Sequence, residues 1–122
     1  METIKSDNEV IAEFDNQMEW YVPNNKKYDA YWRRKGLEVS VKNMKYDKSW
    51  DWTIPVCRRL ITDLLVLIDW LQKQDTIDGD ALHEAKRLKA KLYHEIACLD
   101  LHRVNKALVE GIHWYNQQVK PL

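Results

Sequence analysis

Residues 49–71 read SWDWTIPVCRRLITDLLVLIDWL, and this stretch decides the fold. Its apolar side chains recur at the three- and four-residue spacing of one helix face, at positions 56, 57, 60, 61, 64, 67, 68 and 71. Proline is tolerated in the first turn of a helix, because deeper inside it removes a hydrogen bond. The spacing predicts a central core helix to about residue 73, and Pro55 places its start at about residue 51, with Ser49-Trp50 as an irregular lead-in.

Several large apolar side chains of this stretch lie outside that face. Val66 and Trp70 fall on its flank, which predicts that a second layer of structure covers them. Trp50 and Trp52 lie at the helix entrance, where we expect them to wedge against the sheet or the terminal helix. The alternative is that these two tryptophans form a contact surface.

Two more helices are predicted after the central one, over about residues 80–97 and 100–118. The apolar stripe of the first runs from Ala81 to Leu99, and that of the second from Leu101 to Tyr115. At 100° per residue the two stripes lie roughly 160° apart around one helix axis. We therefore predict a break at residues 98–100, with Asp100 as an N-cap.

The N-terminal third carries strand signals. A short helix capped by Asp7 or Asn8 is expected to end at Phe14, followed by an aromatic strand at 18–22 and a second strand at 28–33. Lys35-Gly36 is the predicted turn before an alternating stretch at 37–42. We expect a small antiparallel sheet or hairpin (about 18–42) packed against the three helices. The fold class is predominantly helical α+β, as one domain over residues 1–122.

Composition narrows the class of protein. The chain has 122 residues, 45% of them apolar and 31% charged, as in globular proteins. Cys57 and Cys98 do not form a CxxC pair, and the N-terminus does not resemble a signal peptide. The longest apolar run, residues 64–68, is far shorter than the roughly 20 residues of a membrane span. We expect a cytoplasmic protein with reduced thiols and no membrane contact.

Charge is unevenly distributed along the chain. Residues 1–22 carry six acidic residues and one lysine, whereas residues 26–48 carry eight basic residues and three acidic ones. The net charges are therefore −5 and +5. The simplest expectation is that the two segments lie against each other in the fold.

Residue patterns for catalysis or metal binding are weak. His83 and His94 are eleven residues apart, about 16 Å along a helix, and the same holds for His102 and His113. Within the central helix, Arg59–Asp63 and Asp69–Lys73 have the spacing of surface ion pairs, and Cys57 has the position of a small core residue. We expect no enzymatic activity, no metal and no cofactor.

The strongest binding signal is the mixture of aromatic and basic residues in segment 26–48. Tyr28, Tyr31 and Trp32 directly precede Arg33, Arg34 and Lys35. Aromatic residues are frequent anchors of protein interfaces, while aromatic and cationic residues together also hold single-stranded nucleic acid. The possible contact residues are Tyr28, Tyr31, Trp32, Arg33, Arg34, Lys35, Trp50 and Trp52.

Three motifs carry a resemblance: NEVIAEF at 8–14, YxxSWDWxxPV at 46–56 and IxWYN at 112–116. They resemble those of a family of small uncharacterised proteins from phages, prophages and mobile elements of gut bacteria. More distantly, they are similar to the phage ABA sandwich domain, in which helices flank a small sheet. Asp15-Asn16 and Thr53-Ile54 depart from the pattern, as does the helix at 80–97 where the family tends to have strands.

The resemblance implies an origin in a mobile element but no activity and no site residues. We therefore expect a small accessory protein that binds an unknown protein partner, or a second copy of itself, through an aromatic surface. The alternative is binding of single-stranded nucleic acid by segment 26–48.

Overall fold

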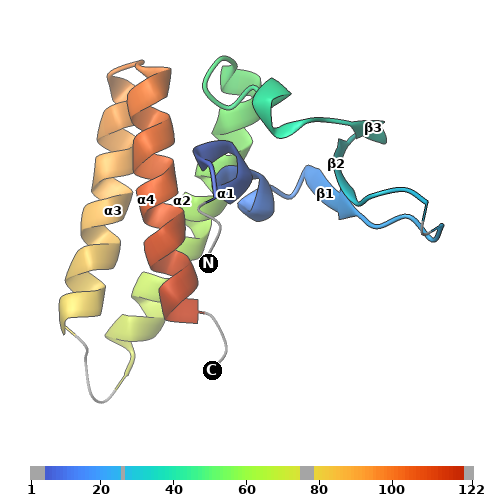
Figure 1. The fold of residues 1–122 in the computed structure, drawn as a ribbon. Helices are drawn as coiled ribbons and strands as arrows, with labels where there is room; N and C mark the ends of the chain where they lie inside the picture. The colour runs from blue at the N-terminus through green and yellow to red at the C-terminus, as the bar shows by residue number, and fades with distance from the viewer. Residues whose placement is uncertain (1–4, 26, 75–78, 120–122) are drawn as a thin grey trace.

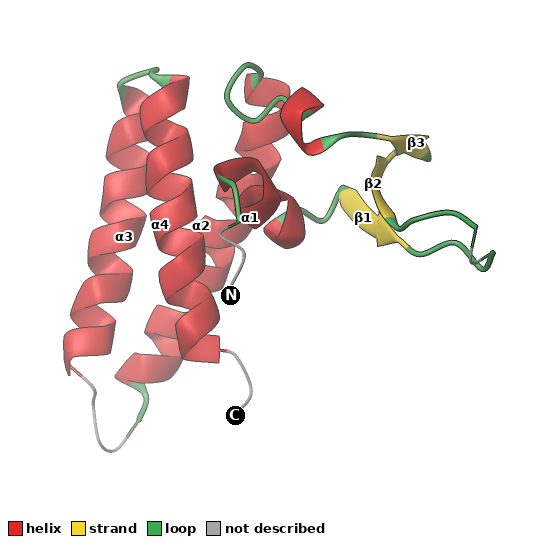
Figure 2. Cartoon of the chain, in the orientation of Figure 1, coloured by secondary structure: helices red, strands yellow, loops and turns green. Residues whose placement is uncertain are grey.

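The computed structural model describes residues 5–25, 27–74 and 79–119. The elements follow in the order α1 (Asp7–Phe14), β1 (Met18–Tyr21), β2 (Tyr31–Arg34), β3 (Leu37–Glu38), the short 3₁₀ helix η1 (Val41–Asn43), α2 (Trp50–Gln72), α3 (Gly79–Ala97) and α4 (Leu101–Val119). Figure 1 shows α2, α3 and α4 running side by side, and Figure 2 shows how small the sheet is beside them. The predominantly helical α+β class is confirmed.

The core lies between the three long helices and α1. The apolar face of α2 packs there with those of α3 and α4, and α1 adds Val10, Ile11 and Phe14. Gly111 of α4 lies where this helix approaches α2, because a Cβ atom at that position would lie 2.8 Å from Leu60 Cδ2. The absent side chain permits the close packing of the two helices.

The sheet is antiparallel, in the order β1-β2-β3. Lys35 and Gly36 both have positive φ angles, 52° and 81°, as a two-residue hairpin turn requires, and the predicted turn is confirmed. The third strand is shorter than expected. It ends at Glu38, and the chain then turns into η1 and buries Met44 and Tyr46 in the core.

Helix boundaries agree with the predictions to within a few residues. Ser6, not Asp7 or Asn8, is the N-cap of α1, and its hydroxyl accepts a hydrogen bond from the Glu9 amide. The break between α3 and α4 is confirmed, since Leu99 has a φ of 57° and Asp100 accepts a hydrogen bond from the Arg103 amide at 3.2 Å. Pro55 is the sixth residue of α2 and lies just beyond the predicted first turn, because the helix already begins at Trp50.

A buried carboxylate joins the sheet to the helices. Asp15 follows α1 and is 5% exposed. Its Oδ2 accepts hydrogen bonds from Arg34 Nη1 of β2 at 2.9 Å and from the Tyr46 hydroxyl at 2.7 Å, while Oδ1 accepts one from the Gln17 amide at 2.9 Å. Three donors offset the cost of burying the charge.

Tyr46 extends this network to two helices. Burial and then the hydrogen bond to Asp15 raise the pKa of Tyr46 far above its usual value, so the hydroxyl remains a donor. Its carbonyl oxygen accepts hydrogen bonds from the hydroxyl of Thr53 in α2 and from the side-chain amide of Asn105 in α4. One loop residue therefore ties together the sheet, α2 and α4.

The network gives a ranked prediction for stability. Asp15→Asn is expected to lower the free energy of unfolding by about 4 kcal/mol, because it leaves the Arg34 charge buried without its counter-ion. Tyr46→Phe removes one hydrogen bond to the carboxylate and is expected to cost about 2 kcal/mol. Urea unfolding of both variants measures the difference. A smaller loss for Asp15→Asn than for Tyr46→Phe would contradict the role assigned to the carboxylate.

Candidate protein-binding surface

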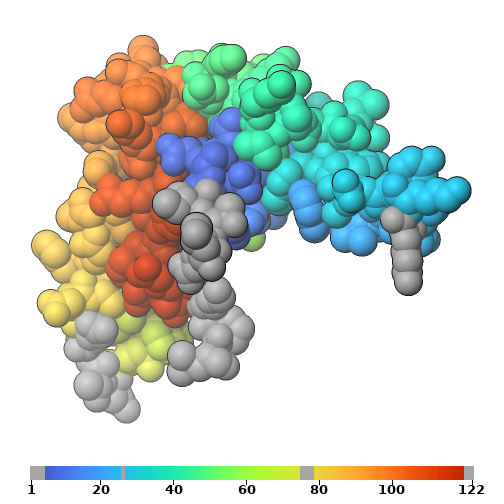
Figure 3. Space-filling view, viewed as in Figure 1, coloured from blue at the N-terminus to red at the C-terminus, as the bar shows by residue number. Residues whose placement is uncertain are grey.

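The sheet extends away from the helices and meets them near α1 (Figure 1). In the space-filling view it forms a protrusion on one side of the helical body (Figure 3). Side chains alternate between the faces of a strand, and residues directly opposite each other share a face. Trp20 opposes Trp32, and Tyr21 opposes Tyr31, so one face carries the tryptophan pair and the other the tyrosine pair.

The tyrosine face carries charges as well as rings. The Tyr21 and Tyr31 ring centroids are 5.3 Å apart. Arg33 Cζ lies 4.2 Å from the Tyr21 centroid, and its guanidinium is ion-paired with Glu19. On this face the cation already has both an aromatic and an acidic partner.

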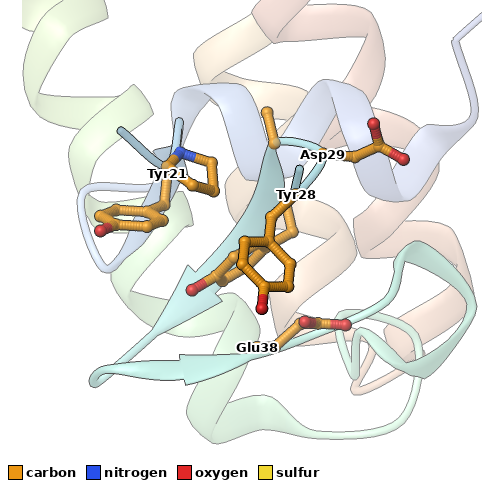
Figure 4. A pocket seen from close by; sticks show the side chains of 7 residues that line it. Tyr21, Tyr28, Asp29 and Glu38 are labelled. Atoms are coloured by element: carbon orange, nitrogen blue, oxygen red, sulfur yellow. The ribbon is translucent and has the colours of Figure 1, made fainter. Parts of the chain in front are cut away.

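A pocket of about 490 Å³ opens beside these tyrosines. Its lining includes Tyr21, Tyr28, Tyr31, Asp29 and Glu38. Figure 4 shows the Tyr28 ring over the hairpin, with its hydroxyl toward the Glu38 side chain. The pocket therefore combines three phenol rings with two carboxylates and no basic residue among the described residues that line it.

The tryptophan face lies toward α1. The Trp20 and Trp32 rings pack edge to face, with centroids 5.2 Å apart. With Glu9 and Glu13 they line a second pocket, of about 400 Å³. Trp20 is 53% exposed, so about half of this large apolar residue is accessible to a partner.

The structure separates the predicted contact residues into two groups. One group lies on the protruding sheet or its turns and is exposed or half-buried: Tyr28, Tyr31, Trp32, Arg33 and Lys35. Of these, Trp32 also packs against the core. Arg34 is different. It is 9% exposed and paired with Asp15, because β2 directs it toward the helices, and it is not positioned to contact a partner.

Trp50 and Trp52 pack against the core, as the preferred interpretation expected. The Trp52 ring lies 4.0 Å beneath Arg34 Cζ and packs edge to face on Tyr46, with the ring centroids 5.3 Å apart. These contacts assign Trp52 to the Asp15 network. The sequence predicts the aromatic strand at 18–22 but does not indicate Trp20 and Tyr21 as candidate contact residues. Only the strand register shows which rings lie beside them.

The opposite charges of the first 48 residues do meet in the fold. Asp15 and Glu19 from the acidic segment pair with Arg34 and Arg33 from the basic one. The charges that a nucleic-acid site would need are thus partly neutralised by the chain's own carboxylates.

Apolar side chains are also accessible on the helical body. Val66 and Trp70 of α2 are 66% and 57% exposed, so the predicted covering layer is wrong within the described part of the chain. Separately, Ile61 and Leu65 of α2 and Tyr93 of α3 line a groove of about 510 Å³, which Val66 and Trp70 do not line. Both features lie on the helical body rather than on the sheet.

The side chains that could take part in catalysis, Cys57 and Asp63, occupy structural positions. Burial raises the pKa of the Cys57 thiol to about 12. Burial also raises the pKa of Asp63, whose carboxylate lies 3.7 Å from Arg59 in the predicted ion pair. Among the described residues, no three His, Cys, Asp or Glu side chains are grouped to hold a metal ion.

The helices give no sign of a membrane span. In the described residues, none combines the length and the hydropathy needed to cross a bilayer.

Comparisons of the chain with protein-family models, curated proteins and solved structures find no match.

Alanine substitutions distinguish core from surface tryptophans. Trp52→Ala is expected to lower the free energy of unfolding by about 3 kcal/mol, because it removes a ring packed on Arg34 and Tyr46. Trp20→Ala is expected to cost less than about 1 kcal/mol, since half of its ring faces solvent. Urea unfolding compares them, and equal losses would contradict the division of the two residues.

The cysteines should react at very different rates. Cys98 is exposed and Cys57 is 1% exposed. With a thiol reagent we expect one fast site, which Cys98→Ser abolishes. Raising the pH to about 9 should not bring Cys57 into the fast phase, because its thiolate forms only above its raised pKa. Fast labelling of the folded Cys98→Ser variant would contradict the burial of Cys57.

Proposed function

We propose that this protein is a non-catalytic accessory protein that binds a partner protein through its three-stranded sheet. The observation that carries the proposal is the group of accessible aromatic side chains on a protruding sheet, above all Trp20 and Tyr28, which are 53% and 66% exposed. Large aromatic side chains immobilise few rotatable bonds on binding and anchor many protein interfaces.

Two kinds of surface on one small sheet support a protein as the partner. Each face offers a pocket lined by aromatic rings, and one sheet edge is formed by β1, which among the described strands pairs with β2 alone. An added strand can hydrogen-bond to such an edge while its side chains reach both faces. A folded protein or an extended peptide can pair with this edge and also place side chains in the two pockets.

Carboxylates among the aromatic residues weigh against nucleic acid. Asp29 and Glu38 line the tyrosine pocket, and Glu9 and Glu13 line the tryptophan pocket. Phosphates next to these groups would be repelled. Binding of single-stranded nucleic acid through segment 26–48 is therefore the less supported alternative.

The origin and location of the protein are part of the proposal. The three sequence motifs support a source in a phage or another mobile element. Free Cys57 and Cys98 agree with the reducing cytoplasm. A second copy of the chain is the other candidate partner, through the exposed side chains of Val66 and Trp70 on α2.

Site-specific cross-linking tests the proposal. A photoreactive amino acid replaces Tyr28 in the protein expressed in its host, and the same amino acid replaces Trp70 as a matched control on α2. We expect a discrete cross-linked protein from position 28 and none of that mass from position 70. The partner is then purified, and its affinity for Trp20→Ala is expected to fall at least about tenfold, with Trp70→Ala unchanged.

Other outcomes contradict the proposal. If Trp20→Ala and Trp70→Ala change the affinity for the purified partner equally, the sheet is not the binding surface. A cross-link to nucleic acid, together with affinity for a fluorescent oligonucleotide that falls steeply with salt, would favour the alternative. Dimerisation lost in Trp70→Ala alone would place self-association on α2.

A further inference from the structure

Three of the six arginine side chains in the chain are bound in the same way. Three guanidinium groups each lie over an aromatic ring and also pair with a carboxylate. The sets are Arg33 with Tyr21 and Glu19, Arg34 with Trp52 and Asp15, and Arg59 with Phe14 and Asp63. The distances from Cζ to the ring centroid are 4.2, 4.0 and 4.3 Å.

Physical chemistry explains why the three components occur together. The face of an aromatic ring carries negative potential and attracts a flat, weakly hydrated guanidinium ion. A carboxylate beside the ring accepts the guanidinium N–H groups, which the ring alone leaves without strong acceptors. A ring and a carboxylate at one position therefore form a site that favours arginine.

The pocket on the tryptophan face has the same two components. Trp20 and Trp32 supply two rings, and Glu9 and Glu13, one turn apart on α1, supply two carboxylates. In the part of the chain that the structure describes, none of the arginines or lysines lies over either ring. Lys5 contacts Glu13 at 2.7 Å, so this carboxylate already accepts an ammonium group from the chain itself.

We infer that this tryptophan–glutamate pocket binds an arginine side chain of the partner protein. The inference rests on the proposed function and adds the chemistry of the partner. The two carboxylates of the pocket select a cation over a phosphate or an acidic segment by charge complementarity. Two rings favour the planar guanidinium over the compact ammonium of lysine.

Indole NMR signals give a direct test. The Nε1–H signals of Trp20 and Trp32 are assigned with the variants Trp20→Phe and Trp32→Phe. The protein is then titrated with the peptide Gly-Arg-Gly-Arg-Gly, up to about 10 mM because an isolated side chain binds weakly. We expect both signals to shift and saturate, whereas the peptide with citrulline in place of arginine, which has a similar shape and no charge, leaves them unchanged.

Charge variants identify the acidic partners. Glu9→Gln combined with Glu13→Gln is expected to weaken peptide binding at least about tenfold, because the rings then act alone. Glu84→Gln, a half-buried glutamate on α3, is the matched control and should change nothing. Urea unfolding verifies that all variants are folded.

Each result decides the inference. Equal shifts with citrulline and arginine, unchanged affinity in the double glutamine variant, or no shift at the highest concentration would each overturn it. The purified partner separates this inference from the proposed function. If Trp20→Ala weakens binding of the purified partner and the double glutamine variant does not, the sheet binds the partner without an arginine in this pocket. If neither variant weakens binding of the partner, the sheet is not the binding surface and the proposed function is contradicted.

Discussion

The structure depends on one buried carboxylate. Asp15 stands where α1 ends and β1 is about to begin, and its oxygens hold Arg34 of the sheet and Tyr46 of the loop before α2. A charge at this depth is tolerated because it is paired and hydrogen-bonded. Its position determines how the sheet is attached: Arg34 anchors one end of β2, and the aromatic end extends beyond the helices.

This attachment divides the aromatic residues into two sets. Rings near the anchor, such as Trp52 and Tyr46, complete the interior and hold the helices in place. Rings beyond it, such as Trp20 and Tyr28, have little of the chain to pack against and are left accessible. The aromatic residues thus have two physical roles, which differ in whether the ring packs on the Asp15 network or is left accessible on the sheet and its loop.

The helices were readable from the sequence because each has one clear apolar stripe. The change of stripe direction at residues 98–100 located the break, since helix geometry ties direction to residue number. Strand length was less readable. The alternation at 37–42 predicted a longer strand, but the burial of Met44 and Tyr46 requires the chain to leave the sheet after Glu38.

The candidate site was only partly predictable. The segment with Tyr28, Tyr31 and Trp32 is identified by composition, and its charges are expected to meet the acidic segment, but the pattern does not show which residues pair. Arg34 looked like a phosphate ligand and is an interior ion pair, because its partner Asp15 lies nineteen residues away and no local pattern connects them. Asp15 itself was noted only as a departure from a family pattern. Glu9 and Glu13 were counted in a charge total, without a location.

By itself, the sequence determined the helical class, the three long helices, the hairpin turn and the abundance of aromatic side chains. These depend on periodicity and on the conformations of Gly36 and its neighbours, which are local properties. Only the tertiary structure decided which rings face solvent and which carboxylates stand beside them. Pocket chemistry depends on contacts between α1 and the sheet, and such contacts are set by packing between segments distant in the chain.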